Sequence, residues 1–308
     1  MERPADPDPD SDPDPDSDPD PVLRPRPPSP LQEVRDERFD RHGVRLLLKR
    51  DDLVHPELPG NKWRKLAPNL RAALAGGYPG LVTFGGAYSN HLRATAAAGR
   101  LLGLETVGIV RGDELAGQPL NESLARCAAD GMRLHFVTRS AYRDKTELPA
   151  RAGAGDAYVV PEGGSNALAL HGCAELGREL RGGCDVVAVA CGTGGTLAGL
   201  AAGLAPDQRA VGVPVVGGGF LEAEIRSLQA AAFGGPAGDW SLAEGYAHGG
   251  YARVPRELAA FAADFGSRHG LPVERIYVAK LLWALLDLTG AGAFPRGTTL
   301  TAVVTGRP

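Results

Sequence analysis

The stretch LVTFGGAYSNH, residues 81–91, decides the fold class of this chain. Its first four residues are an apolar run typical of a buried strand, and two glycines then permit a sharp turn. Ser89 and Asn90 follow where a helix cap belongs, and a cap is the plain interpretation of this pair. The alternative is an anion site, because the free N–H groups at a helix start attract a carboxylate, to which both side chains would add contacts.

The same order of strand, turn and helix repeats on both sides of this stretch. Apolar runs typical of strands occupy residues 81–84, 106–110, 134–137, 157–160, 186–190, 211–216 and 300–304. Segments with helical periodicity occupy residues 63–75, 90–102, 122–129, 167–180, 196–204, 221–232, 256–269 and 276–288. The alternation predicts an α/β fold with mainly parallel sheets that are flanked by helices. Because ligands bind beyond the carboxyl ends of such strands, the loops after the strands are where chemistry is expected.

A second glycine-rich turn, CGTGGT at residues 191–196, also follows an apolar strand and opens a helix. Its converging N–H groups and two threonine hydroxyls would suit a phosphate group. The loop lacks the Gly-Lys-Ser/Thr ending of a nucleotide P-loop and does not match GxGxxG. A nucleotide-binding α/β protein stays open as an alternative on this loop alone.

Lys62 lies in GNKWRKL, residues 60–66, at the start of a predicted helix. Only five of the 33 basic residues are lysines. A chain that prefers arginine keeps lysine where a nucleophilic nitrogen is needed, since guanidinium stays protonated; a solvated lysine is the plain alternative. A candidate Schiff-base lysine, a phosphate cradle and a carboxylate site are together what an enzyme needs to hold pyridoxal phosphate and an amino acid.

Several longer stretches make the chain recognisable. They are KRDD at residues 49–52, GNKWRKL at 60–66, FGGAYSNH at 84–91, PEGGSNALALHGCAEL at 161–176, ACGTGGTLAGL at 190–200 and AHGGYARV at 247–254. Over residues 31–306 the chain resembles the 1-aminocyclopropane-1-carboxylate (ACC) deaminase/D-cysteine desulfhydrase family. The resemblance implies pyridoxal 5'-phosphate as the cofactor, the two-lobed fold type II of tryptophan synthase β, and a homodimer.

The resemblance also implies which residues bind the cofactor. Lys62 would carry it as a Schiff base, Asn90 would contact its phenolic oxygen, and Thr305 would lie near its ring nitrogen. The phosphate group would be held by Gly192, Thr193, Gly194, Gly195 and Thr196.

Other residues are implied on the substrate side. Ser89 and Asn90, together with His91, would take the substrate carboxylate. Tyr251 and Tyr277 match the pair of tyrosines that faces the substrate in this family. As isolated residues, both tyrosines could equally be core aromatics with a satisfied hydroxyl.

The chain departs from the family pattern in four places. Val278 stands where deaminases carry a glutamate, which would leave the ring nitrogen less supported and disfavour opening of a cyclopropane. The neutral Thr305 fits the desulfhydrase branch better, and residues 274–277 read ERIY in place of Asp-Pro-Val-Tyr. Arg307 replaces a glycine in a tight cofactor loop, which puts contacts to the ring in doubt. Pro68 is expected to kink the helix after Lys62 or to shift its start.

The predicted organisation has a tail and two lobes. Residues 1–30 form an acidic Asp/Pro tail that is expected to be disordered, because it has almost no side chain to bury. Residues 65–160 form a small lobe that packs on a large cofactor-binding lobe of residues 31–64 and 161–308.

The predicted function is that of a deaminating lyase on a small amino acid. D-cysteine desulfhydration, to pyruvate, sulfide and ammonia, is the leading hypothesis, and ACC deamination to 2-oxobutanoate is the second. Released Lys62 is the expected base for the Cα proton, with Ser89 or Tyr277 as alternatives. A catalytically degenerate protein that binds pyridoxal phosphate is a further alternative, motivated by the altered C-terminus.

Charge and cysteine content limit the partners. Residues 1–21 carry −8, so the rest of the chain is +4, with 32 basic against 28 acidic residues and no basic stripe; nucleic acid is not expected. The four cysteines show no metal-ligand spacing, so no metal is predicted, and they are typical of reduced thiols. Neither a membrane span nor a signal peptide is visible, and we expect a cytoplasmic protein without a membrane partner.

Overall fold

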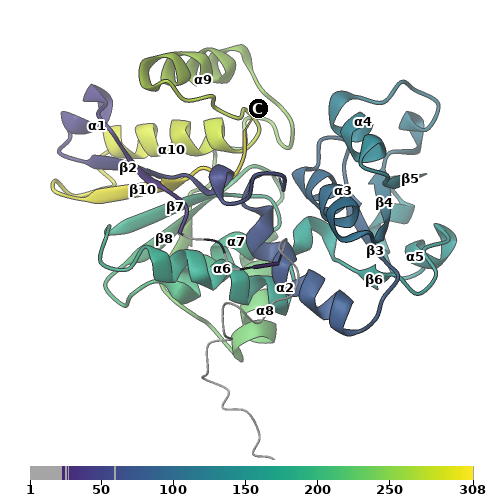
Figure 1. The fold of residues 1–308 in the computed structure, drawn as a ribbon. Coiled ribbons are helices and arrows are strands. Elements are labelled where there is room, and N and C mark those ends of the chain that lie inside the picture. The colour runs from purple at the N-terminus through teal and green to yellow at the C-terminus, as the bar shows by residue number, and fades with distance from the viewer. Residues whose placement is uncertain (1–22, 25, 27, 59, 308) are drawn as a thin grey trace, which may run out of the picture.

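The chain folds into two sheets that are covered by helices (Figure 1). The structure is a computed structural model that describes residues 23–24, 26, 28–58 and 60–307. The larger sheet has, in order across it, β1 (Leu31–Val34), β2 (Arg45–Lys49), β10 (Thr299–Val303), β7 (Val186–Cys191), β8 (Arg209–Pro214) and β9 (Trp240–Leu242). The smaller sheet has, in order, β5 (Arg133–Val137), β4 (Glu105–Arg111), β3 (Gly80–Gly85) and β6 (Tyr158–Val159). The helices are α1 (Glu37–Asp40), α2 (Lys62–Ala75), α3 (Asn90–Leu102), α4 (Glu122–Ala129), α5 (Leu148–Arg151), α6 (Ala167–Glu179), α7 (Gly195–Gly203), α8 (Leu221–Phe233), α9 (Arg256–His269) and α10 (Val278–Gly290).

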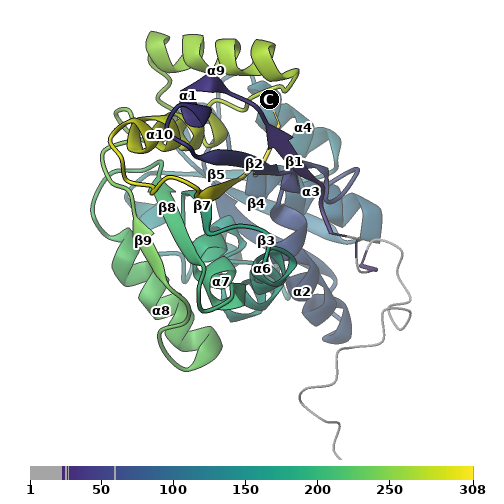
Figure 2. The same cartoon turned by 90° about the vertical axis from the view of Figure 1, so that its left-hand side faces the viewer.

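Strands from both ends of the chain form the larger sheet. β10 lies between β2 and β7, and its Thr301 pairs with Leu47 on one side and with Val187 on the other. Every pairing in this sheet is parallel except that of β1 with β2. Helices α9 and α10 lie on one face, and α6, α7 and α8 lie on the other (Figures 1 and 2). The carboxyl ends of β7 and β10 therefore reach the same edge of the sheet.

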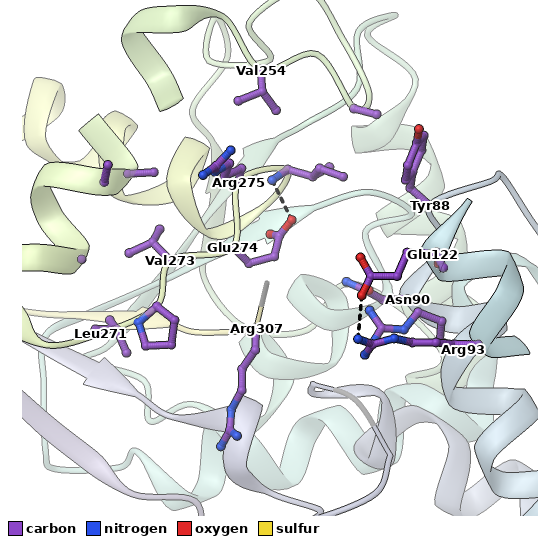
Figure 3. A pocket seen from close by; sticks show the side chains of 18 of the residues that line it. Tyr88, Asn90, Arg93, Glu122, Val254, Leu271, Val273, Glu274, Arg275 and Arg307 are labelled. Carbon is purple, nitrogen blue, oxygen red and sulfur yellow. Dashed lines mark hydrogen bonds and ion pairs between the residues drawn. The ribbon is translucent and has the colours of Figure 1, made fainter. Parts of the chain in front are cut away.

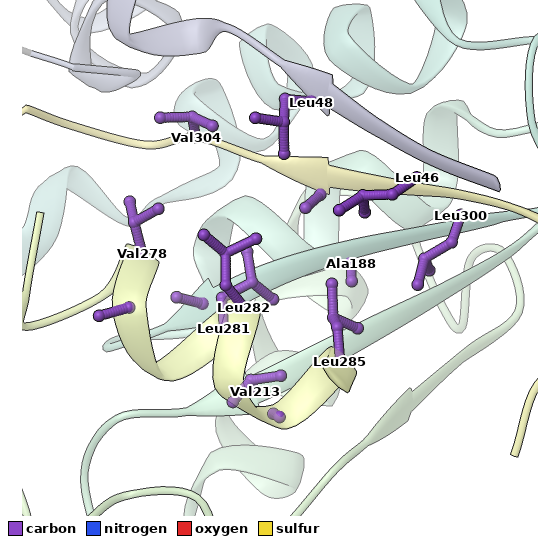
Figure 4. Packing of buried hydrophobic residues seen from close by; sticks show 14 of the residues in the cluster. Leu46, Leu48, Ala188, Val213, Val278, Leu281, Leu282, Leu285, Leu300 and Val304 are labelled. Atoms are coloured by element: carbon purple, nitrogen blue, oxygen red, sulfur yellow. The ribbon is translucent and has the colours of Figure 1, made fainter. Parts of the chain in front are cut away.

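Apolar side chains from this sheet and from α10 form the largest core cluster (Figure 4). Leu46, Val213 and Leu300 of the strands pack with Leu281 and Leu285 of the helix, and each of them is fully buried. Burying one such side chain stabilises the fold by about 1.5–3 kcal/mol relative to leaving it in water. The core fixes α10, and the residues before its first turn are thereby fixed at the sheet edge.

The smaller sheet is wholly parallel. Leu92 of α3 and Leu124 of α4 pack with Val110 of β4 on one face, whereas Tyr142 and Leu148 pack on the opposite face. Helix α2 lies between α3 and α6, so it connects the layers of the two sheets (Figure 1).

Ion pairs fix the first turn of α2. Arg64 donates to both carboxylate oxygens of Asp51, at 2.7 and 2.8 Å, and to those of Glu179, at 2.8 and 2.9 Å. Lys49 pairs with the same Glu179 at 2.6 Å. These groups are largely buried, so removing one partner would leave an uncompensated charge in the interior. The network holds the start of the helix, where Lys62 lies.

Pro68 does not interrupt the helix after Lys62, and the expected kink stays a prediction. Helix α2 runs unbroken from Lys62 to Ala75 with Pro68 inside it. Proline leaves the carbonyl of Arg64 without its helical hydrogen bond, and Gly172 of α6 packs there so closely that a Cβ would lie 1.9 Å from that oxygen. The close packing of α2 on α6 keeps the helix intact through the proline.

The predicted fold class, α/β with mainly parallel sheets flanked by helices, is confirmed. Seven strands and eight helices lie where the sequence predicts them, within a few residues, and α3, α4 and α9 match their predicted bounds. The sequence prediction lacked β1, β2 and β9, as well as the one-turn helices α1 and α5. The division of the chain into lobes at residues 64 and 160 stays a prediction.

Most of the predicted acidic tail lies outside the described residues. Its last part differs from the prediction, because Leu23 is buried in a core cluster and Ser29 donates to Asp51 at 2.6 Å. Lys49 also donates to the Ser29 carbonyl at 2.7 Å. The packed body therefore begins before residue 31.

Candidate active site

A cavity of about 490 Å³ lies where the ends of several strands and helix starts converge. Its walls include the loops after β3, β7 and β10 and the first residues of α2 and α3. Of the residues singled out by the sequence, it is lined by Lys62, Ser89, Asn90, His91, Gly192, Thr193, Gly194, Thr196, Tyr251, Tyr277 and Thr305. Residues far apart in sequence thus meet in one place.

Lys62 is the first residue of α2 and lies partly buried in this cavity. Its amine makes no hydrogen bond with another described residue. Burial, with the positive charge of Lys65 adding to it, lowers the pKa of Lys62 to about 7. Near neutral pH a large fraction of this amine is therefore unprotonated, which is the form that attacks a carbonyl.

The start of α7 forms a cradle for an anion. Gly194, with φ of 76°, precedes the helix and provides no side-chain cap, so the first N–H groups stay available. The hydroxyls of Ser165 and Thr193 lie 2.6 Å apart beside it. A Cβ at Gly195 would lie 2.5 Å from Ser165 Oγ, so only glycine keeps this space open.

Lys65 completes this cradle, and the sequence analysis missed it. Its ammonium donates to Ser165 Oγ at 2.7 Å and to the Gly163 carbonyl at 3.0 Å, although its side chain is only 1% exposed. A buried ammonium is costly, and burial lowers the pKa of Lys65. The spacing in GNKWRKL was the available signal, because Lys65 follows Lys62 by three residues and so lies on the same face of the helix.

Ser89 and Asn90 begin α3 at the opposite wall. Ser89 is the helix cap, and its Oγ accepts from the Leu92 N–H at 3.3 Å. The amide of Asn90 makes no hydrogen bond with a described residue and faces the cavity. The plain interpretation of Ser89 as a cap is thus correct, and its hydroxyl proton and the Asn90 amide stay free for a ligand.

His91 is buried and uses one ring nitrogen inside the protein. Thr83 Oγ1 donates to the Val160 carbonyl at 2.8 Å, so it accepts from His91 Nε2 at 2.7 Å. Burial and the charges of Lys62 and Lys65 keep the pKa of His91 well below its usual range. The imidazole is neutral, and its Nδ1 is an acceptor without a hydrogen-bond partner. This arrangement disfavours the predicted contact of His91 with a carboxylate.

Tyr251 and Tyr277 lie side by side, with ring centroids 6.1 Å apart. Tyr277 approaches the phosphate loop, since a Cβ at Gly192 would lie 3.5 Å from its ring. Burial raises the pKa of Tyr277 well above its usual range, and Tyr251 beside it raises it further. Burial also raises the pKa of Tyr251. Both phenols therefore stay protonated at neutral pH and can donate a proton but not accept one readily.

The segment after β10 closes the cavity. The Thr305 carbonyl accepts from the Asn61 N–H at 3.1 Å, next to Lys62. A Cβ at Gly60 would lie 2.1 Å from the same oxygen, so the two loops touch because Gly60 is a glycine. Thr305 itself lines the cavity.

Arg307 does not enter this cavity. It donates to Asp52 at 3.0 Å and lines a separate groove of about 890 Å³ (Figure 3). Asn90 lines both the groove and the cavity. The side chain of Arg307 turns toward η1 (Asp51–Leu53) instead.

We compared the chain with known protein families, curated proteins and solved structures. The family model described as "Pyridoxal-phosphate dependent enzyme" matches residues 22–306. The chain belongs to this family. A protein of Pyrococcus furiosus, provisionally named as an ACC deaminase, is 30% identical over 274 residues, which cover 81% of each chain. A D-cysteine desulfhydrase of Yersinia pestis is 33% identical over 269 residues, or 80% of this chain and 81% of the relative.

A solved structure described as an "ACC deaminase homologue" is also similar. It has a TM-score of 0.77 and 27% identity, and the match covers 90% of this chain and 89% of that one. The chain is therefore a pyridoxal-phosphate-dependent enzyme of the ACC deaminase/D-cysteine desulfhydrase group, with the fold type II that the sequence predicted.

The residues present fit the cofactor of this family. The glycine cradle with Lys65 offers N–H groups, hydroxyls and a positive charge to a phosphate, and Lys62 offers a reactive amine in the same cavity. Their assignment as cofactor-binding residues stays a prediction.

Position 278, where the resemblance led us to expect an acid, carries a valine. Val278 is buried in the core with Leu282 (Figure 4), and it is not among the described residues that line the cavity. Glu274 caps the start of α10 instead, because its carboxylate accepts from the N–H groups of Ile276, Tyr277 and Val278 at 2.7, 2.7 and 3.1 Å. Among the described residues that line the cavity, the carboxylates are those of Glu162 and Glu224.

In the part of the chain that the structure describes, we find no helix long and apolar enough to cross a membrane.

Proposed function

We propose that this enzyme eliminates the β-substituent of a small amino acid, with D-cysteine as the leading substrate and pyruvate, sulfide and ammonia as the products. One observation favours this activity over ACC deamination: position 278 carries a buried valine where deaminases carry an acid. Without a carboxylate there, the hydroxyl of Thr305 is the candidate partner for the ring nitrogen. A cofactor ring whose nitrogen has no carboxylate partner is a weaker electron sink. Such a sink is enough for the loss of a good leaving group, but it is less suited to the opening of a cyclopropane.

In this proposal Lys62 is the base that removes the Cα proton. Bound pyridoxal phosphate supplies an electron sink that acidifies the Cα–H bond of the amino acid. Once its amine is free, Lys62 takes that proton at Nζ, and its depressed pKa suits a base that works near neutral pH. Ser89 is an alternative base, but its Oγ already accepts from Leu92.

The tyrosines act at the other end of the substrate. Because the pKa of Tyr277 is raised, its phenol stays protonated and can donate a hydrogen bond to the departing β-substituent. Tyr251 lies against it and orients it. The free N–H groups at the start of α3, with Asn90, would hold the substrate carboxylate. The released 2-aminoacrylate takes up water and yields pyruvate and ammonia.

ACC deamination is the second candidate, because relatives of similar identity carry that name or provisional name. A degenerate protein that binds the cofactor without turnover is the third, although the Arg307 side chain contacts Asp52 and does not line the cavity. On the likeness to its family we also propose a cytoplasmic homodimer, which analytical ultracentrifugation of the purified protein tests.

The deciding experiment compares absorption spectra of the wild type and of Lys62→Ala with pyridoxal phosphate added. The wild type should show the visible band of a protonated Schiff base, and Lys62→Ala should not, whereas Lys145→Gln should keep the band. The wild type is then given D-cysteine and ACC. Sulfide release supports the proposal, 2-oxobutanoate supports the second candidate, and a band without turnover of any amino acid supports the third. Absence of the band would refute the assignment of Lys62.

A further inference from the structure

One cation in the cavity has no hydrogen-bond or ion-pair partner among the described residues. Four cationic side chains line it among the described residues. Lys62 is assigned to the cofactor, Lys65 is hydrogen-bonded in the phosphate cradle, and Lys145 pairs with Glu162 at 3.2 Å. Arg111 makes no hydrogen bond and no ion pair with another described residue.

Arg111 is exposed, but the fold restricts its position. It is the last residue of β4, where its backbone pairs with Val137 of β5. Its guanidinium lies 5.5 Å from the ring centroid of Tyr142, which is itself buried. A guanidinium over an aromatic face is attracted to it and loses conformational freedom, while its five N–H donors stay free.

The guanidinium reaches the substrate side of the cavity. A Cβ at Gly86 would lie 3.6 Å from Arg111 Nη2 and 3.8 Å from Cε1 of Tyr251. Gly86 therefore leaves open the space between the arginine and the substrate-facing tyrosine. The phosphate cradle is built from other segments, those at residues 163–165 and 192–196 with Lys65.

The charge around Arg111 is not compensated. Lys145 lies 4.5 Å from the same Tyr142 ring, but Glu162 balances it. The Tyr142 hydroxyl is buried without a hydrogen-bond partner. This corner of the cavity thus offers a full positive charge and free donors to a ligand anion.

We infer that Arg111 selects substrates whose β-substituent carries negative charge, of which a thiolate is the smallest, whereas a sulfinate or sulfonate is larger and stays ionised at neutral pH. The inference rests on the proposed elimination. In that step the Cα–H and Cβ–S bonds break, the proton goes to Lys62, and the sulfur group leaves with the electron pair. Water then converts 2-aminoacrylate to pyruvate and ammonia, so cysteate plus water gives pyruvate, sulfite and ammonia. A guanidinium next to the leaving group stabilises the anion that departs.

The competing role for Arg111 is to bind the α-carboxylate, which every amino acid substrate shares. A comparison of substrates with anionic and with neutral β-substituents distinguishes the two roles. An arginine on the α-carboxylate affects all substrates alike, whereas an arginine on the β-substituent affects only the charged ones.

The test compares three holoenzymes: the wild type, Arg111→Gln and Arg126→Gln. Arg126→Gln is the control, because it removes an exposed arginine outside the cavity. Pyruvate formation is measured with cysteine sulfinate, cysteate and the neutral β-chloroalanine, each as both enantiomers. Arg111→Gln should lower kcat/KM about ten- to hundredfold for the anionic substrates and by no more than about twofold for β-chloroalanine. Equilibrium dialysis of the same amino acids should show the same selectivity in binding.

Equal losses on all substrates, or none on the anionic ones, would overturn the inference. So would a wild type that turns over β-chloroalanine but neither binds nor converts the anionic amino acids. If the wild type forms no pyruvate from any amino acid, the proposed elimination fails. Dialysis still decides the role of Arg111 in that case, because selective loss of anion binding in Arg111→Gln would support it.

Discussion

Lys280 donates a hydrogen bond from its ammonium to the carbonyl of Gly250, at 2.8 Å. The same ammonium donates to the Ala247 carbonyl, also at 2.8 Å, and the side chain is fully buried in α10. Tyr251 is the next residue along the chain. The loop that carries this tyrosine is therefore fastened to the helix whose first turn follows Tyr277.

Lys280→Met should loosen this loop and lower kcat/KM on the preferred amino acid, while the Schiff-base band stays. Two partly buried carbonyls lose a charged donor, so the free energy of unfolding should fall by about 2 kcal/mol, measured in urea. Arg226→Met, which removes an exposed arginine paired with Glu222, is the control and should change stability by less than about 0.5 kcal/mol. A Lys280→Met protein as stable as the control would show that these contacts contribute nothing.

The pH dependence of cofactor uptake should report the depressed pKa of Lys62. Only the neutral amine reacts, so below pH 7 the initial rate should rise with pH as the amine loses its proton. Because the pKa of Lys62 is about 7, the rate should level off above that pH instead of rising toward pH 10, as it would for an ordinary lysine. Stopped-flow absorption of the cofactor-free protein measures this. In Lys65→Met the plateau should move to higher pH, since the charge that lowers the pKa of Lys62 is gone.

Removing the buried ammonium beside the glycine cradle should weaken phosphate binding specifically. We expect Lys65→Met to lower the affinity for pyridoxal phosphate about ten- to hundredfold, because a charge-assisted contact to the phosphate is lost. Affinity for pyridoxal, which lacks the phosphate, should change little. Lys65→Arg keeps the charge and serves as the matched variant. If both compounds lose affinity equally in Lys65→Met, the residue supports the fold and not the phosphate.

Closing the cradle with a methyl group should have a similar effect by a different cause. A Cβ in Gly195→Ala would lie 2.5 Å from Ser165 Oγ and 3.0 Å from Lys65 Nζ, so both must move. Retention of pyridoxal phosphate on dialysis should fall, and the thermal midpoint should drop by a few degrees. Gly290→Ala, in open space at the end of α10, is the control and should keep both properties. Full retention by Gly195→Ala would place the phosphate elsewhere.

Much of this architecture could be predicted because its signals are local. Buried parallel strands such as β3 and β7 are largely apolar runs. The bounds of α3 are marked by the cap at Ser89 and by Gly103, with φ of 65°, after its end. The strands that were missed lack such signals. β2 begins and ends with a charged residue, and β9 has three residues, so each is defined by its neighbours in the sheet.

The site residues likewise divide into those with a local sequence signal and those without one. Lys62, the loop at residues 192–196 and the start of α3 follow strand ends or helix starts and were predictable from that order. Lys65 was not, because its role depends on Ser165, which is 100 residues away in sequence. The direction of the Arg307 side chain could not be predicted either, because its partner Asp52 is 255 residues away in sequence.

The place of β10 in the middle of the larger sheet has a consequence for biosynthesis. Its two neighbours, β2 and β7, are made long before it and cannot complete the sheet until it arrives. Thr305, just beyond it, closes over Gly60 and Asn61 only then. In a nascent chain on the ribosome, Lys62 at the start of α2 thus lies beside an unfinished sheet, and the cavity around it is completed only after β10 has been synthesised.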